Sequence, residues 1–406
     1  MRRHYGGALP RLSKRVLQNL NSQFPIGNSA YIDSMSRRFA YAASLLVLLA
    51  IVFQFQPNLG EPVGAVADIQ IARSQFAQYL DDLSEPEGTF DTHNFISNET
   101  SYLHVIPELR RRVKPGFVYI GVGPDQNFSY IVHTKPSLAI ITDIRRQNML
   151  EHLLYKALFD LSNSRAEYLG LLFSREVPRG DSKTSLRELL RGIRTARATD
   201  ERFRSNMTAV RNRLLQLYGL KLTAEDLRKI EYVYRTLYEE GLDLRFESIG
   251  RNNASNYPTF ESLLLQTDRS GTEQGYLSSE ELFQWMKRFQ SENRLIPIVG
   301  DFAGPRAFKA VAGFLQKNGL MVSAFYTSNV EYYLFDGSQW RPYVANVRGL
   351  PLTDDAVFIR SYFAAAGPHP QNVPGHRSTT LVQSIRDFLR AETAGRNRSY
   401  WDVVAP

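Results

Sequence analysis

The sequence predicts an α/β protein with a doubly wound, mostly parallel sheet, a helical insertion and one hydrophobic helix ahead of the sheet. Short apolar runs that end at glycine or polar residues alternate with amphipathic helical patterns, first over residues 117–161 and again over residues 295–363. Buried strands that alternate with helices are typical of a parallel sheet with both faces covered. Residues 185–290 change to arginine-rich helical patterns and polar loops, which indicate an insertion.

The N-terminal part is expected to reach a membrane. Residues 1–38 are interpreted as a basic arm, with Met35 as an alternative start, and residues 39–55 contain no charged side chain. A spanning helix needs about 20 apolar residues, and the arginines before this segment place the N-terminus in the cytoplasm and the following domain outside. The alternatives are a signal peptide cleaved near Ala67, or a buried helix.

The domain around the sheet is expected to span residues 101–406, after a linker with one helix at residues 56–100. Its expected strands are apolar runs at residues 117–121, 138–142, 295–299, 320–326 and 357–363. The expected helices lie at residues 101–112, 124–134, 145–161, 223–237, 278–290, 305–316 and 381–389. The arginines between residues 187 and 213 are interpreted as a solvated helix face with local ion pairs, with anion binding as the alternative.

The composition excludes several kinds of protein and site. The chain has 406 residues and no cysteine, which excludes disulfides, thiolate metal sites and cysteine nucleophiles. Residues 1–38 carry seven basic and one acidic side chain, whereas the remainder carries 42 and 40. The nearly neutral remainder gives no reason to expect a nucleic-acid partner. The histidines show no metal-ligand spacing.

The stretch FVYIGVGPDQNF, residues 117–128, runs from a predicted strand through a glycine pair into a helix. It holds four candidate binding residues: Gly121, Gly123, Asp125 and Asn127. Glycine allows the backbone to approach a ligand, and the helix N-terminus suits an anionic group. Asp143 ends the next strand, where a carboxylate can accept hydrogen bonds from both hydroxyls of a ribose. The stretch therefore predicts a Rossmann-like fold that binds a small-molecule ligand.

Two further predicted strands end in polar loops, at Gly300-Asp301-Phe302 and at residues 326–331. Ligands of open α/β sheets bind outside the carboxyl ends of the strands. We therefore expect Asp301, Tyr326 and Asn329 to face the same crevice as the glycine pair.

Three segments resemble the class I S-adenosylmethionine-dependent methyltransferases: VYIGVGPDQN (118–127), IITDI (140–144) and PIVGDFAG (297–304). The resemblance covers roughly residues 117–162 and 294–363. It implies that Gly121 and Gly123 line the methionine part of the cofactor, that Asp143 holds its ribose and that Ile144 packs on its adenine. The segments GDFAG and AFYTSNVEYYLF are also similar to a bacterial family with this fold for which no activity is established.

The resemblance also assigns the catalytic end of the crevice. It takes residues 297–304 as the fourth strand of the family, whose end faces the substrate, so Asp301 lies where the methyl group is transferred. We expect Tyr326 and Asn329 to position the acceptor together with Asp301. The sequence departs from the family at Tyr119, where an acidic residue is usual, and at Asp125, where a third glycine is usual.

Each candidate has a plainer explanation. The glycine pair can serve tight packing between strand and helix without a ligand. Asp143 can cap the helix that begins near Arg145, Asp301 can cap the helix that begins at Pro305, and Asn329 can be a turn residue.

These patterns predict an S-adenosylmethionine-dependent methyltransferase-like protein with an unidentified acceptor. The alternatives are a non-enzymatic membrane-anchored or exported protein that keeps the fold, and a binder of another nucleotide ligand. The expected partners are a small-molecule ligand and, through residues 39–55, a membrane. S-adenosylmethionine is a cytoplasmic metabolite, whereas the charge bias sends the domain outward.

Overall fold

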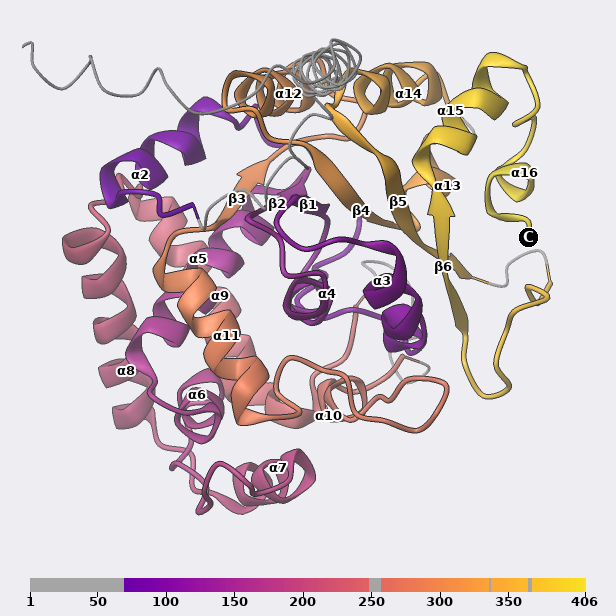
Figure 1. Cartoon of the computed structure of the whole chain (residues 1–406). Helices are drawn as coiled ribbons and strands as arrows, with labels where there is room; N and C mark the ends of the chain where they lie inside the picture. Colours follow the sequence, from indigo (N-terminus) through magenta and orange to yellow (C-terminus); the bar gives the residue numbers. More distant parts are fainter. Residues whose placement is uncertain (1–68, 248–256, 336, 364–366) are drawn as a thin grey trace, which may run out of the picture. The chain divides into compact units, whose positions relative to one another are not determined.

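Six strands form one sheet in the order β3-β2-β1-β4-β5-β6. They are β1 (Val118–Gly121), β2 (Leu138–Asp143), β3 (Leu295–Val299), β4 (Val322–Ser328), β5 (Leu352–Phe363) and β6 (Ser378–Ser384). β1 to β5 pair in parallel, and β6 pairs with β5 in antiparallel orientation. The computed structural model describes residues 69–247, 257–335, 337–363 and 367–406, within the unit Gly64–Pro406 (Figure 1).

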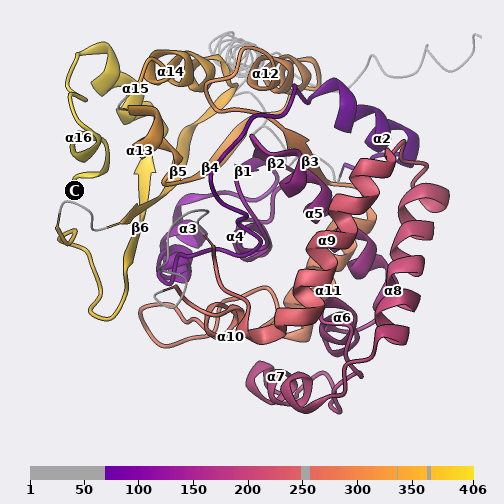
Figure 2. The ribbon, with the colours of Figure 1, turned by 180° about the vertical axis from the view of Figure 1, so that it is seen from behind.

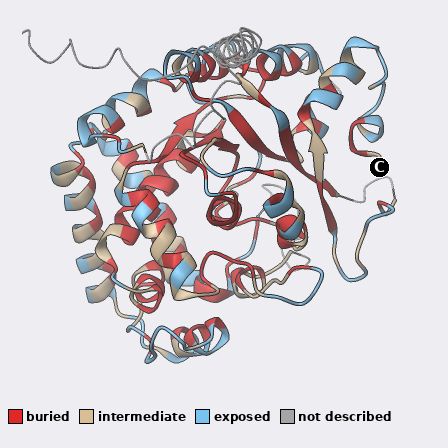
Figure 3. Cartoon of the chain, in the orientation of Figure 1, coloured by how far each residue is buried: buried red, intermediate tan, exposed pale blue. Residues whose placement is uncertain are grey.

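The inner strands are buried on both faces, as their apolar sequences predict. Every residue of β1, β2 and β3 is buried. On β4, Phe325 packs against Phe308 of α12 (Ala307–Lys317), with ring centroids 5.7 Å apart. The next residue, Tyr326, packs against Tyr130 of α4 (Gln126–Thr134), with centroids 5.0 Å apart. Helices therefore cover both faces, and Figure 3 shows the middle of the sheet buried between them.

The chain between β2 and β3 is helical and includes the segment predicted as an insertion, residues 185–290. Its helices are α5 (Arg146–Leu161), α6 (Arg165–Leu172), α7 (Leu186–Thr195), α8 (Asp200–Asn212), η2 (Arg213–Leu217), α9 (Ala224–Glu240), η3 (Gly241–Asp243), α10 (Phe260–Leu264) and α11 (Glu280–Ser291). α9 packs beside α5 (Figure 2), and there Arg146 pairs with Asp226 at 2.6 Å. Arg194, Arg202 and Arg213 also form ion pairs, but their partners lie in other segments of the chain and not beside them on the same helix. The predicted ion pairing is therefore observed for these three arginines, although it is not local.

The remaining helices flank the sheet. α2 (Arg73–Asp82), η1 (Tyr102–Val105) and α3 (Ile106–Arg112) precede β1. α13 (Val330–Phe335) and α14 (Trp340–Gly349) connect β4 to β5, and α15 (Ile385–Thr393) and α16 (Tyr400–Val404) follow β6.

The predicted α/β fold with a mostly parallel sheet is confirmed. The helix predicted over residues 381–389 is wrong in its first half, because residues 378–384 pair with β5 as β6 and the helix begins at Ile385. The hydrophobic helix predicted over residues 39–55 lies outside the described residues. Among the residues that the structure describes, no helix is both long and apolar enough to cross a membrane.

Candidate functional site

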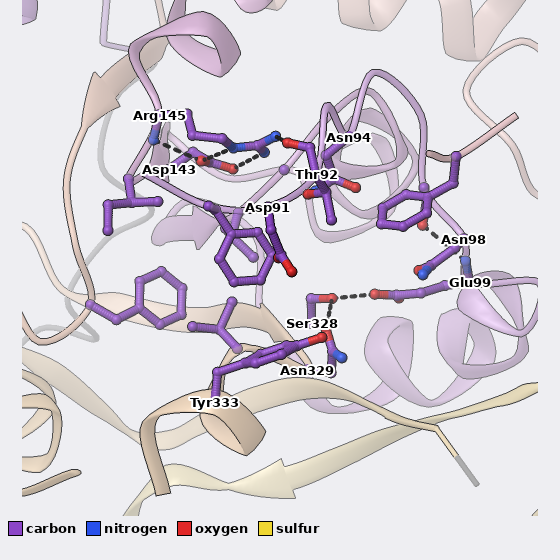
Figure 4. Close-up of a pocket in the computed structure, with 18 of the residues that line it drawn as sticks. Asp91, Thr92, Asn94, Asn98, Glu99, Asp143, Arg145, Ser328, Asn329 and Tyr333 are labelled. Atoms are coloured by element: carbon purple, nitrogen blue, oxygen red, sulfur yellow. Dashed lines mark hydrogen bonds and ion pairs between the residues drawn. The ribbon is translucent and has the colours of Figure 1, made fainter. Parts of the chain in front are cut away.

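The candidate site is a cavity of about 340 Å³ at the carboxyl ends of β1, β2, β3 and β4, which we call the crevice (Figure 4). The loops after these strands form one wall, and the irregular segment 90–99, which precedes β1, forms the facing wall. The sheet order reverses here, because the chain leaves β1 toward β2 and β3 and later returns to β4 on the other side of β1. Ligands of open α/β sheets bind at such a point.

Five of the nine site residues predicted from the sequence line the crevice: Gly123, Asp143, Ile144, Asp301 and Asn329. The other four lie outside its lining, in buried positions: Gly121, Asp125, Asn127 and Tyr326. The expected meeting of strand ends is therefore observed, although nearly half of the predicted residues contact protein instead of the cavity.

Gly121 serves internal packing. A Cβ at this position would lie 2.0 Å from Oδ1 of Asn127 and 2.8 Å from the ring of Tyr119. Asn127 accepts a hydrogen bond from Tyr119 Oη at 2.8 Å and donates through Nδ2 to the carbonyl oxygens of Val122 and Pro124. The inside of the glycine loop is thus filled by Asn127, and Tyr119 belongs to the same network.

Asp125 precedes α4 and contacts the insertion. It is 5% exposed, and Tyr276 Oη donates to its Oδ2 at 3.1 Å. Burial is the main reason that the pKa of Asp125 rises from 3.8 to about 7. A carboxyl group in this position stabilises packing with the insertion best when it is protonated.

Asp143 lines the crevice with most of its acceptor capacity already used. Arg145 donates to Oδ1 through its backbone N and its Nε, both at 2.9 Å, and to Oδ2 through Nη2 at 2.8 Å. Its Nη1 also donates to the carbonyl oxygens of Thr92 and His93. Since a carboxylate has about four acceptor positions, one position on Oδ2 is left for a ligand.

Asp301 follows β3, not the fourth strand, so the position predicted for it is wrong. β3 is the edge strand next to β2, which places Asp301 on the Asp143 side of the crevice, with β2 and β1 lying between β3 and β4. Its Oδ1 accepts from the backbone N of Ala303 at 2.9 Å. The carboxylate of Glu85 accepts from the backbone N of Asp301 at 2.7 Å, and it also caps the start of α12 by accepting from the backbone N of Arg306 at 3.0 Å.

Glu99 is the site residue that the sequence did not reveal, because it lies in a segment interpreted as a linker. It lines the crevice and is 1% exposed. Its carboxylate accepts hydrogen bonds from three hydroxyl groups: Tyr326 Oη at 2.8 Å, Ser328 Oγ and Ser361 Oγ. Burial raises the pKa of Glu99, and these three hydrogen bonds act against the increase.

Unusual backbone conformations gather at the crevice. Asn94, Gly123 and Ser328 line it with φ of 54°, 79° and 52°. This left-handed conformation is costly for a serine, and such outliers persist where the surroundings hold them. At Ser328 the hydrogen bond to Glu99 is one of the contacts that hold it.

The lining is acidic and aromatic. Among the described residues of the lining, the charged side chains are four carboxylates, of Asp91, Glu99, Asp143 and Asp301, and one guanidinium, of Arg145. Phe90 and Tyr333 lie at the mouth with ring centroids 5.2 Å apart. In the described part of the chain, no group of three or more histidine, aspartate or glutamate side chains is placed to hold a metal ion.

Comparison with known proteins gives a family but no activity. The family model described as "Domain of unknown function (DUF7790)" matches residues 94–402. No curated protein matches the chain.

Proposed function

Since the chain belongs to the DUF7790 family, whose description names no activity, we propose a function from the geometry of the crevice. We propose a methyltransferase-like protein of Rossmann-like fold that binds S-adenosylmethionine in the crevice and whose acceptor is unidentified. The strand order and the position of the crevice support this fold type. When bound, the cofactor supplies an electrophilic methyl group.

The observation that carries the proposal is the charge of the lining. Four carboxylates against one guanidinium favour a cationic or neutral ligand. S-adenosylmethionine has a sulfonium cation, whereas nucleotides with phosphate groups are anionic and would be repelled. The aromatic rings of Phe90, Phe302 and Tyr333 add faces that attract cations. The alternative of a phosphorylated nucleotide ligand is therefore disfavoured.

The residues fit the adenosyl half of the cofactor better than its amino-acid half. Ile144 and Asp301 are suited to contact the base, because both lie on the β2–β3 side of the crevice. Asp143 keeps one acceptor position for a ribose hydroxyl beside Arg145. The methionine part does not fit the inside of the glycine loop, because Asn127 fills that space.

Calorimetry of the full chain in mild detergent tests the proposal. We expect S-adenosylmethionine and S-adenosylhomocysteine to bind and adenosine diphosphate to bind much more weakly. Asp301→Asn should weaken the binding of both adenosyl compounds, whereas Glu239→Gln, an equal change of charge on the exposed face of α9, should not. Binding of neither adenosyl compound would contradict the proposal.

A second candidate is a non-enzymatic protein, membrane-anchored or exported, that keeps the fold without the cofactor. The Arg145–Asp143 pair and the filled glycine loop favour it. It also agrees with the proposed membrane anchor at residues 39–55, which would place the domain away from the cytoplasmic cofactor. A reporter fused after residue 60 would report the side of the membrane, and an extracytoplasmic signal together with absent cofactor binding would favour this candidate.

A further inference from the structure

Glu99 is a buried carboxylate in the crevice without an arginine or lysine partner in the described structure. Some other buried carboxylates are paired with arginine, such as Asp143 with Arg145 and Glu331 with Arg360. Asp125 and Glu151 are buried and accept hydrogen bonds from tyrosines, but they do not line the crevice. A buried carboxylate is costly unless it is paired or hydrogen-bonded.

The three hydroxyl donors of Glu99 leave part of its acceptor capacity unused. Oε1 accepts from Tyr326 and Ser328, and Oε2 accepts from Ser361. One acceptor position therefore remains on Oε2. Because all three donors are neutral, they solvate the charge of Glu99 without balancing it.

Gln126 provides an independent sign of a missing donor. It lines the same crevice, is 7% exposed, and its Oε1 has no hydrogen-bond partner. Its orientation follows from the network: Tyr326 uses its only proton on Glu99, so it must accept from Gln126 Nε2, at 2.8 Å. Gln126 Oε1 is thus left without that partner, and an unpaired buried acceptor costs about 1–3 kcal/mol.

We infer that Glu99 and Gln126 form a subsite for a primary ammonium group of the ligand. An ammonium group carries one positive charge and three N–H donors and has no acceptor, which matches an unbalanced carboxylate and an orphaned amide oxygen. Tyr326 joins the two residues and fixes both in place. Its predicted role as a catalytic residue is thereby replaced by that of a positioning residue.

The inference deepens the proposed function and rests on it, because two sources can supply the ammonium group. One is the amino-acid end of the cofactor, which the filled glycine loop cannot accept in the expected place. In that case Glu99 supplies the carboxylate that the sequence lacks at Tyr119. The other source is an amine acceptor held at the β4 side of the crevice.

Calorimetry of the full chain at pH 7.5 separates these sources. The probes are S-adenosylhomocysteine, 5′-methylthioadenosine, which lacks the amino-acid end, and butylamine with butanol as its uncharged counterpart. If the cofactor fills the subsite, S-adenosylhomocysteine binds more tightly than methylthioadenosine. Glu99→Gln should then reduce this preference roughly 10- to 100-fold, as expected for hydrogen bonds to a charged group, and leave methylthioadenosine unchanged. If an acceptor fills it, butylamine binds in preference to butanol, and Glu99→Gln removes that preference.

Controls keep the test decisive. Gln126→Met removes the orphaned acceptor at similar size and should reduce the same preference, which covers the case in which Glu99→Gln does not fold. Glu239→Gln removes one negative charge far from the crevice and should change neither preference. Preferences that are absent, or that persist in both crevice variants, overturn the inference. A Glu99-dependent preference for butylamine without binding of any adenosyl compound would support the ammonium subsite and refute the proposal that the crevice binds S-adenosylmethionine.

Discussion

Asp125→Asn is expected to stabilise the protein more at alkaline than at acidic pH. Burial raises the pKa of Asp125 from 3.8 to about 7, so the folded state favours the protonated carboxyl group. The stability contributed by this group is complete below pH 3.8 and is lost as the pH rises through about 7. A shift of this size corresponds to about 4 kcal/mol. Asparagine has nearly the same shape and no charge, so the variant does not lose this stability as the pH rises.

The assay is urea unfolding followed by tryptophan fluorescence for the wild type and the variant. We expect the stability gained in the variant to grow from about 1 kcal/mol at pH 4.5 to about 4 kcal/mol at pH 8. The quantity to compare is the difference in the free energy of unfolding between the variant and the wild type. Other groups also titrate in this range: burial lowers the pKa of His104, His133 and His152 to about 4, which makes both proteins less stable as the pH falls. This effect cancels in the difference. Glu151 acts in the same direction as Asp125, because burial raises the pKa of Glu151 and the nearby Asp125 carboxylate adds to the increase.

Asp82→Asn is the matched control, because it makes the same chemical change at an exposed position at the end of α2. An asparagine that lacks a partner for its Nδ2 would lower the stability of Asp125→Asn by a constant amount at every pH. Therefore only the change of this stability difference with pH tests whether the pKa of Asp125 is raised. A difference for Asp125→Asn that is flat between pH 4.5 and 8 would refute it.

Three further changes have definite expected outcomes. Gly121→Ala should destabilise by about 1–3 kcal/mol in urea unfolding, because the new Cβ would meet Asn127; loss of ligand affinity without loss of stability would show instead that Gly121 faces a ligand. Glu331→Gln should cost about 3–5 kcal/mol in the same assay, since it leaves the buried Arg360 unpaired, and the double variant with Arg360→Met should cost less. Lys156→Met should stabilise more at pH 7 than at pH 10, because burial lowers the pKa of Lys156 from 10.5 to about 7 and the charged form becomes costly as the pH falls; an equal effect at both values would contradict this assignment.

The core of the fold could be read from the sequence because its strands are short apolar runs with clear ends. The run at residues 295–299 coincides with β3, and those at 117–121 and 138–142 differ from β1 and β2 by one residue. β6 escaped prediction because Ser378–Ser384 is rich in serine and threonine and lies at the edge of the sheet, where its pairing with β5 decides the conformation. The apolar pattern of a strand does not indicate its position in the sheet, so β3 was predicted to be the fourth strand of the methyltransferase fold.

The candidate site was predictable only where its residues follow strands. Gly123, Asp143 and Asn329 reached the crevice because the carboxyl ends of parallel strands meet at one edge. Glu99 and Arg145 were missed for a different reason. Their roles depend on contacts with residues 52 or more positions away, or on a pairing between Arg145 and Asp143 that competes with the ligand, and spacing in the sequence reports neither.

The segment ahead of β1 also bears on where a functional fragment can begin. The family match starts at residue 94, yet Glu85 caps α12, Phe90 lies at the mouth of the crevice and the carbonyl oxygen of Thr92 holds Arg145. A fragment cut at residue 94 would keep every strand and lose the first part of the wall formed by residues 90–99. The segment that the family model recognises is therefore shorter than the fragment needed to form the complete crevice. A fragment for ligand-binding experiments should begin before α2.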